Sequence, residues 1–201
     1  MNTPHTPTAD LPATASLAPV LRRRMRGVTL TELLAVVAIL SVLLTGAATA
    51  WHKVGTSMRL SSYSNVFVSQ LNLARSESIK RNGRVVMCKS ADGAACASSG
   101  GWEQGWLVFH DANNNGLRES GETLIRRGEA LPAGYRILGN ELVARYVSFS
   151  PFGGTRLASG AFQAGTITIC KRSEGPAEGR QVVINSVGRP RVQRANLNLC
   201  L

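Results

Sequence analysis

The chain has 201 residues, 44% of them hydrophobic and 17% charged, with a formal net charge of +11. This hydrophobic content excludes a largely disordered protein, and the length allows one ordinary domain with an appendage. Residues 1–27 hold four arginines and one aspartate, so the remaining chain keeps eight of the eleven net charges. Such an excess of positive charge is compatible with binding to a polyanion or to an anionic membrane surface, and it also occurs in basic soluble proteins.

The first 52 residues combine a basic leader with an apolar segment. A start rich in Pro and Thr leads into a cluster of arginines: Arg22, Arg23, Arg24 and Arg26. Residues 33–50 carry no charge, and with "VTLTE" before them they make about 23 residues, enough for a helix to cross a bilayer. The preceding basic residues keep the N-terminus inside. We predict a leader over residues 1–27 and a transmembrane helix half over residues 28–52.

Glu32 is the one ionisable residue in this apolar segment. A charge inside a membrane costs about 3 kcal/mol or more without a partner, so it usually marks function. A cut after Gly27 would create a partner, because Val28 would then carry a free amine. The alternatives are a secretory signal peptide cleaved near "TGAATA" and a plain membrane anchor, and neither accounts for the carboxylate.

The stretch "RGVTLTELL" resembles the prepilin signature of type IV pilins. In that family a peptidase cuts after the glycine, the new amine is methylated, and the fifth mature residue is a glutamate. The resemblance implies cleavage after Gly27, methylation of Val28, and an assembly role for Glu32, which would neutralise the amine of a neighbouring subunit. Val28 stands where phenylalanine is more usual in the family.

Residues 53–83 form the second predicted half of the helix. Apolar and small residues recur at helical spacing, which predicts one buried face: Leu60, Tyr63, Phe67, Leu71, Ala74 and Ser78. Asn82 and Gly83 predict a C-terminal cap.

Residues 84–201 predict a β-rich globular head with a basic C-terminal tail. Short runs rich in β-branched and aromatic residues are separated by turn residues: "RVVMC", "GWLVFH", "ETLIRR", "YRIL", "ARYVSFS", "GTITIC" and "RQVVIN". No long helix intervenes, so the fold class is α+β, with the long N-terminal helix packed on antiparallel sheet. Over residues 22–201 this layout resembles the GspH/FimT family of type IV minor pilins and pseudopilins, FimT-like members above all.

Four cysteines follow the apolar segment, on the side that is expected outside the cytoplasm. Of three possible connectivities we favour Cys88 with Cys96, which closes a short Gly/Ala loop, and Cys170 with Cys200, which ties down the tail. The alternative is that the cysteines bind zinc, but no Cys-x-x-Cys spacing occurs.

The stretch "DANNNGLRESGE" fits the spacing of a calcium loop. Asp111, Asn113 and Asn115 alternate before Gly116, and Glu122 falls at the twelfth position. The alternative is a polar hairpin loop whose Asn and Gly residues adopt left-handed conformations, and the strand-like flanks favour it. We predict no metal site and no cofactor.

The tail holds arginines without any acidic residue: Arg180, Arg189, Arg191 and Arg194. Arginine suits phosphate oxygens, and Pro190 restricts the chain between two of them. The alternative is a basic edge strand whose charge prevents aggregation. Gly188, Arg189 and Arg191 resemble the GRxR tail motif of FimT-like pilins, which bind DNA in natural transformation, and this resemblance implies DNA binding mainly through phosphates.

The sequence does not predict an enzyme. His52 and His110 stand apart, and Glu103, Asp111 and Glu129 are scattered carboxylates. The expected partners are other pilin subunits, prepilin peptidase and DNA, with the inner membrane before assembly. The expected location is a single-pass inner-membrane protein with a periplasmic head, later part of a pilus or pseudopilus. The alternative is a FimU-like minor pilin or a GspH-like type II secretion pseudopilin without DNA binding.

Overall fold

The computed structural model describes residues 27–201, and the side chains of residues 45–50, 52 and 53 lie outside that description. The predicted leader over residues 1–27 therefore lies outside the described residues, apart from Gly27. The chain divides into two compact units, residues 1–46 and residues 47–201, and each is described by itself.

One helix, α1 (Leu30–Arg81), contributes to both units. It ends as the sequence predicts: Asn82 is left-handed with φ of 47°, its N–H bonds to Ile79 O, and the Gly83 N–H bonds to Ser78 O. These two hydrogen bonds form a Schellman cap, which satisfies carbonyl groups of the last turn.

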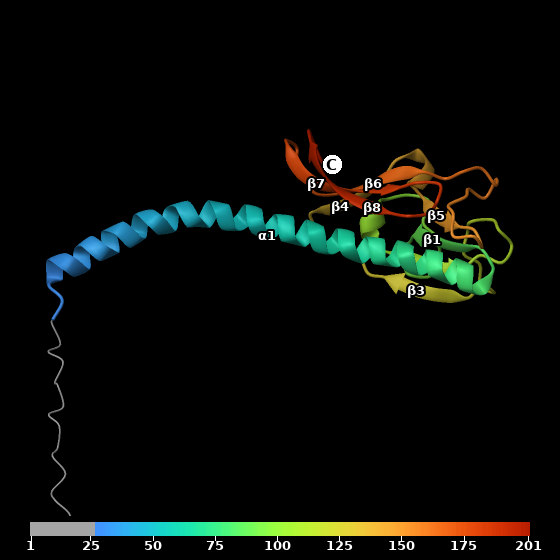
Figure 1. The fold of residues 1–201 in the computed structure, drawn as a ribbon, viewed down its shortest axis with the longest axis horizontal. Coiled ribbons are helices and arrows are strands. Elements are labelled where there is room, and N and C mark those ends of the chain that lie inside the picture. Colours follow the sequence, from blue (N-terminus) through green and yellow to red (C-terminus); the bar gives the residue numbers. More distant parts are fainter. Residues whose placement is uncertain (1–26) are drawn as a thin grey trace, which may run out of the picture. The chain divides into compact units, whose positions relative to one another are not determined.

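The head contains two four-stranded antiparallel sheets (Figure 1). The first has the order β3-β2-β1-β5 and the second the order β4-β6-β7-β8. Their strands are β1 (Val85–Lys89), β2 (Trp106–His110), β3 (Leu124–Gly128), β4 (Tyr135–Gly139), β5 (Tyr146–Phe149), β6 (Gly165–Lys171), β7 (Ala177–Ile184) and β8 (Arg191–Leu197), with short 3-10 turns at Trp102–Gln104 and Glu141–Val143. The predicted α+β class and antiparallel pairing are confirmed.

The main core lies between α1 and the inner faces of both sheets. Leu60, Phe67, Leu71 and Ala74 of α1 are fully buried in it, as the helical periodicity predicted. The Phe67 ring stands edge-on to Trp102 and Trp106, with both centroid distances at 5.4 Å. Edge-on aromatic pairs of this kind add to the stabilisation from burial.

A smaller core covers the outer face of the first sheet. It is built from Val86, Cys88, Leu107 and Phe109, and the partly buried Cys96 packs against it. Because β1 is covered on both faces, all five of its residues are buried. Disulfides join Cys88 to Cys96 and Cys170 to Cys200, the pairing favoured from the sequence.

Candidate assembly segment and nucleic-acid interface

The N-terminal candidate residues flank the start of α1. Gly27 and Val28 are exposed, and Thr29 is the N-cap residue: its Oγ1 accepts a hydrogen bond from the Glu32 N–H at 3.3 Å. Glu32 therefore stands at the third helical position, where a carboxylate also interacts favourably with the helix dipole. Among the residues described it forms no ion pair.

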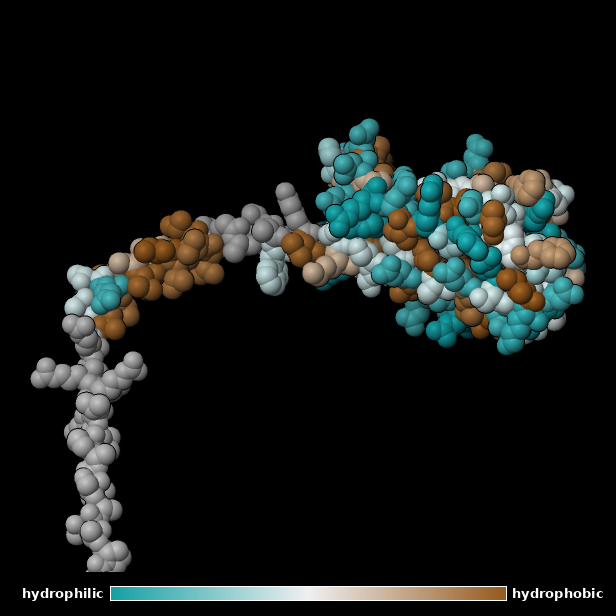
Figure 2. Space-filling model, viewed as in Figure 1, coloured by the Kyte–Doolittle hydropathy of each residue, from teal (hydrophilic) through white to brown (hydrophobic). Residues whose placement is uncertain are grey.

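Apolar side chains are exposed along the first part of α1. Leu33, Val36, Val37, Leu40 and Leu44 each leave half or more of their surface accessible, and Figure 2 shows apolar residues gathered on this stretch. Within the described residues, no helix has both the length and the apolar character needed to cross a membrane. The predicted membrane half over residues 28–52 includes side chains outside the description and stays a prediction.

The predicted DNA contacts lie mainly on the hairpin of β7 and β8. The Gly188 N–H bonds to Asn185 O at 2.9 Å, and the Arg189 N–H bonds to Asn185 Oδ1 at 3.2 Å. Asn185 thus fixes the backbone at Arg189, whose side chain is exposed. Gly188 is buried and has φ of 77°, so it serves the turn.

Arg191 and Arg194 are both exposed on β8, the edge strand of the second sheet. Arg194 pairs with Arg180 and Arg191 with Val183 across the β7–β8 ladder. Since strand residues alternate between faces, two residues three positions apart point to opposite faces. The structure therefore distributes these arginines around the edge of the sheet instead of gathering them on one face.

The structure does not place Arg180 among the exposed candidate DNA contacts. Only 4% of its surface is exposed, and it lies between β7 and α1. Its guanidinium donates hydrogen bonds to Ser57 Oγ at 2.8 Å, Ser61 Oγ at 3.3 Å and Gly179 O at 3.1 Å. These partners hold Arg180 against the helix, where a nucleic acid does not reach it directly.

The sequence interpretation missed the helix residues that face β8. Ser57, Ser61 and Asn65 recur every four positions and therefore share one side of α1. Together with Arg194 they line a groove beside the strand. The sequence does show these small polar residues at helical spacing, next to the apolar face of the helix. Only the tertiary structure shows that they lie beside Arg194.

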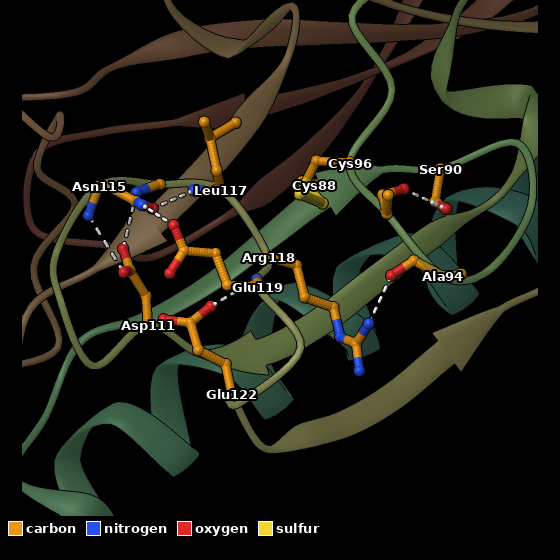
Figure 3. The surroundings of a disulfide bond; sticks show 12 residues. Cys88, Ser90, Ala94, Cys96, Asp111, Asn115, Leu117, Arg118, Glu119 and Glu122 are labelled. Carbon is orange, nitrogen blue, oxygen red and sulfur yellow. Dashed lines mark hydrogen bonds between the residues drawn. A yellow bond between two sulfur atoms is a disulfide. The ribbon is translucent and has the colours of Figure 1, made fainter.

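The calcium-like sequence forms a polar loop between β2 and β3 (Figure 3). Asp111 is buried and accepts hydrogen bonds from the Asn115 and Gly116 N–H groups. Glu122 accepts from the N–H groups of Ala112 and Glu119. Asn114 and Gly116 are left-handed, with φ of 63° and 76°. These features favour the hairpin-loop alternative, and within residues 27–201 no group of three His, Cys, Asp or Glu side chains is placed to hold a metal.

Glu103 and His110, two other residues considered for catalysis, have structural contacts. Glu103 forms an ion pair with Arg136 at 2.8 Å and accepts a hydrogen bond from the Ile137 N–H. His110 packs against Gly83 beyond the end of α1. Glu103 and Asp111 therefore hold loops together, at opposite ends of β2.

Two groups near the first disulfide have displaced pKa values. Burial lowers the pKa of Lys89, the charge of Arg145 adds to this, and Glu103 opposes it. The Lys89 ammonium donates a hydrogen bond to Gly100 O at 2.7 Å. N–H groups of Ala95 and Ala94, with the Ser90 hydroxyl, lower the pKa of Asp92 to about 2. The hydrogen bonds of Lys89 and Asp92 stabilise the loop around Cys96, and these bonds do not indicate a ligand site.

A methylation-type N-terminus ahead of a long helix, with antiparallel sheets packed on the second half of that helix, defines the class of type IV pilin-like proteins. The sequence model of the prokaryotic N-terminal methylation motif matches residues 22–48, and that of type II transport protein GspH matches residues 64–188. The chain belongs to the GspH family. It is a minor type IV pilin or a pseudopilin, and the predicted family is confirmed.

Two solved structures have a similar fold. Two crystal forms of the type IV minor pilin FimU from Pseudomonas aeruginosa PAO1 resemble the chain, with 19% and 18% identity and TM-scores of 0.51 and 0.50. Each match covers 71% of this chain, and 96% and 100% of the FimU chains. No curated protein matches the chain. Pilins and pseudopilins are structural proteins, so membership implies assembly with other subunits after processing at the methylation motif.

Proposed function

We propose that this chain is a FimT-like minor pilin that is assembled into a type IV pilus and binds DNA for uptake in natural transformation. The observation that carries the proposal is the exposure of the three arginines on the β7–β8 hairpin and their lack of ion pairs with described residues. Arg189, Arg191 and Arg194 are exposed, and none of them forms an ion pair with any described residue. Exposed guanidinium groups free of carboxylates are available to phosphate oxygens.

Binding of this kind depends on phosphates and not on base sequence. Three arginine contacts on double-stranded DNA give a slope of log K against log salt of about −2 to −3. One subunit therefore binds weakly at physiological salt. Several subunits along one filament raise the apparent affinity through multivalency.

The N-terminal segment supports the assembly half of the proposal. Prepilin peptidase cuts after Gly27, Val28 is methylated, and Glu32 neutralises the Val28 amine of a neighbouring subunit. Before assembly the chain is a single-pass inner-membrane protein with a periplasmic head, held by residues 28–52. The exposed apolar side chains of this stretch supply a surface for lipid and later for the helices of other subunits.

The second candidate is an assembly-only protein, either a FimU-like minor pilin or a GspH-like pseudopilin. The position of β8 favours it, because charged side chains on an edge strand prevent unwanted pairing between sheets. In the assembly-only candidate, the exposed arginines prevent pairing of β8 with other sheets and do not bind nucleic acid.

DNA binding by the purified chain in detergent micelles separates the two candidates. Fluorescence anisotropy of a labelled DNA duplex is measured across a salt series for the wild type and for the double variant Arg189→Ala/Arg191→Ala. The matched control is Arg126→Ala/Arg127→Ala, which removes two exposed arginines from β3 in the other sheet. We expect salt-sensitive binding that the hairpin variant loses and the control keeps. No binding at low salt, or equal loss in both variants, would favour the assembly-only candidate.

A further inference from the structure

Arg180 is a buried cation that has no acidic partner in the part of the chain that the structure describes. Its side chain lies between β7 and α1, and among residues 27–201 no carboxylate forms an ion pair with it. Its hydrogen bonds go to neutral acceptors, the Ser57 and Ser61 hydroxyl groups and a backbone carbonyl. Neutral acceptors satisfy the N–H groups but leave the charge uncompensated, and burying such a charge is costly.

A second arginine increases this cost. Arg194 stands directly opposite Arg180 in the β7–β8 register. Directly opposed residues on neighbouring strands project to the same face with their Cβ atoms about 5 Å apart, and like charges in such pairs repel. The two guanidinium groups thus concentrate positive charge where α1 meets the edge of the sheet.

A groove with a mixed polar and apolar lining opens beside these two arginines. It has a volume of about 520 Å³ and is lined by Arg194, Asn65, Ser57, Ser61 and Ser62, with Met58 and Val66. Arginine can only donate, so Ser57 Oγ accepts the bond from Arg180 and does not use its own hydrogen in that contact. The Ser61 hydroxyl donates to the Ser57 carbonyl at 3.0 Å. The donors that the groove presents next to the two positive charges are therefore the Ser57 and Ser62 hydroxyl groups and the Asn65 amide.

We propose that this groove binds a phosphate group. Arg194 and the Ser57 hydroxyl donate to its oxygens, and Arg180 supplies charge from behind the serines. The natural source of the group is a backbone phosphate of DNA, and this part of the inference rests on the proposed function. Binding would extend the DNA interface from the hairpin onto α1, which the tail motif alone does not predict.

The geometry of β8 agrees with a nucleic acid backbone as the source. Residues 191–194 of β8 extend over roughly 10 Å at about 3.3 Å per residue, and Arg189 lies two residues before the strand begins. Nucleic acid charges follow one another at about 3.4 Å per strand along the helix axis. A strand that meets Arg189 at the turn is therefore able to place a later phosphate at Arg194 and the groove.

The test uses a substitution that places a carboxylate in the groove. Asn65→Asp introduces a negative charge at an exposed groove position, where it competes with phosphate for the two arginines. Asn72→Asp is the matched control, since Asn72 is also exposed on α1 but does not line the groove. Both variants carry the same change in net charge.

The first measurement is the unfolding temperature of the purified chain in detergent, in sodium phosphate and in sodium chloride of equal ionic strength. Ligands that bind the folded state raise this temperature. We expect phosphate to raise it by several degrees for the wild type and Asn72→Asp, and by less than one degree for Asn65→Asp. The same response in all three proteins would overturn the phosphate site.

The second measurement is DNA affinity at low salt for the same three proteins. We expect Asn65→Asp to bind several-fold more weakly than Asn72→Asp. If phosphate stabilises the wild type but no protein binds DNA, the proposed function fails and the phosphate site remains. If DNA binding depends on Arg189 and Arg191 but is equal for Asn65→Asp and Asn72→Asp, the proposed function stands and the groove is not part of the DNA interface.

Discussion

Gly188 and Gly153 meet backbone to backbone beneath the turn that joins β7 to β8. A Cβ atom on Gly188 would overlap the Gly153 carbonyl oxygen, and the φ of 77° at Gly188 is one that other residues rarely adopt. The same oxygen accepts a hydrogen bond from Arg75 Nε at 2.9 Å, which ties the loop at Gly153 to α1. The glycine before Arg189 is thus required by the fold.

Gly188→Ala is expected to lower the free energy of unfolding by about 1–3 kcal/mol, because it combines a left-handed residue with a close backbone contact. Urea unfolding followed by circular dichroism measures this. Gly175→Ala is the control, since a Cβ at Gly175 has no neighbour within 4 Å and its φ is not in the left-handed region. Equal unfolding midpoints for the two variants would contradict the structural role of Gly188.

The helix and most of the strands were predictable because their patterns are local. Helical spacing identified the buried face at Leu60, Phe67 and Leu71, and Asn82 with Gly83 marked the helix end. Seven strands carry β-branched or aromatic runs. The sequence predicted β8 only as the alternative of a basic edge strand, because "RVQRANL" has few apolar residues and pairs at the exposed edge of the sheet.

The arginine interface was predictable only in part, because exposure is a tertiary property. Arg180 and Arg194 look alike in the sequence, yet the first lies on an interior strand against α1 and the second on the sheet edge. The apolar neighbours in "RQVVI" were the local sign that residue 180 begins a buried stretch. Ser57 and Ser61, whose hydroxyl groups accept hydrogen bonds from Arg180, lie about 120 residues earlier in the sequence. No local sequence pattern connects these serines with Arg180.

Glu32→Ala and Glu32→Gln are expected to be cleaved at Gly27 and inserted in the membrane, but not incorporated into filaments. Neither side chain neutralises the amine of a neighbouring subunit, and an uncompensated charge in an apolar setting costs about 3 kcal/mol or more. Immunoblots of sheared pili and of membranes, from cells that express each variant, measure incorporation and processing.

Ser41→Ala is the control for this pair, because Ser41 lies in the same segment and its hydroxyl group donates to the Ala38 carbonyl within the helix. It is expected to assemble normally. Wild-type amounts of the Glu32 variants in sheared filaments would exclude the assembly role of the carboxylate.

Removal of each of the two disulfides is expected to lower the free energy of unfolding by a different amount. The Cys170–Cys200 bridge spans 30 residues and the Cys88–Cys96 bridge spans 8. Loop-closure entropy in the unfolded chain gives roughly 3.5 kcal/mol for the longer loop and roughly 2.5 kcal/mol for the shorter one. Paired Cys→Ser variants compared by urea unfolding test this order, and a larger loss for the short loop would show that packing in the small core dominates.

Asp92 is expected to give the head an acid-sensitive loop. Its Oδ1 accepts hydrogen bonds from the Ala95 N–H at 3.0 Å, the Ala94 N–H at 2.8 Å and the Ser90 hydroxyl at 3.1 Å, and these lower its pKa from 3.8 to about 2. A depressed pKa in the folded state contributes stability that is present above pH 3.8 and is lost as the pH falls through 2.

Asp92→Asn keeps a hydrogen-bond acceptor in the loop and removes the charge, so it isolates this contribution. The wild type is expected to unfold at a higher temperature than the variant above pH 4, and the two unfolding temperatures are expected to converge toward pH 2. Thermal unfolding between pH 2 and 6, with an NMR titration of the Asp92 carboxyl, measures both. A constant difference across that range, or an Asp92 pKa near 3.8, would show that the N–H groups do not stabilise the ionised form.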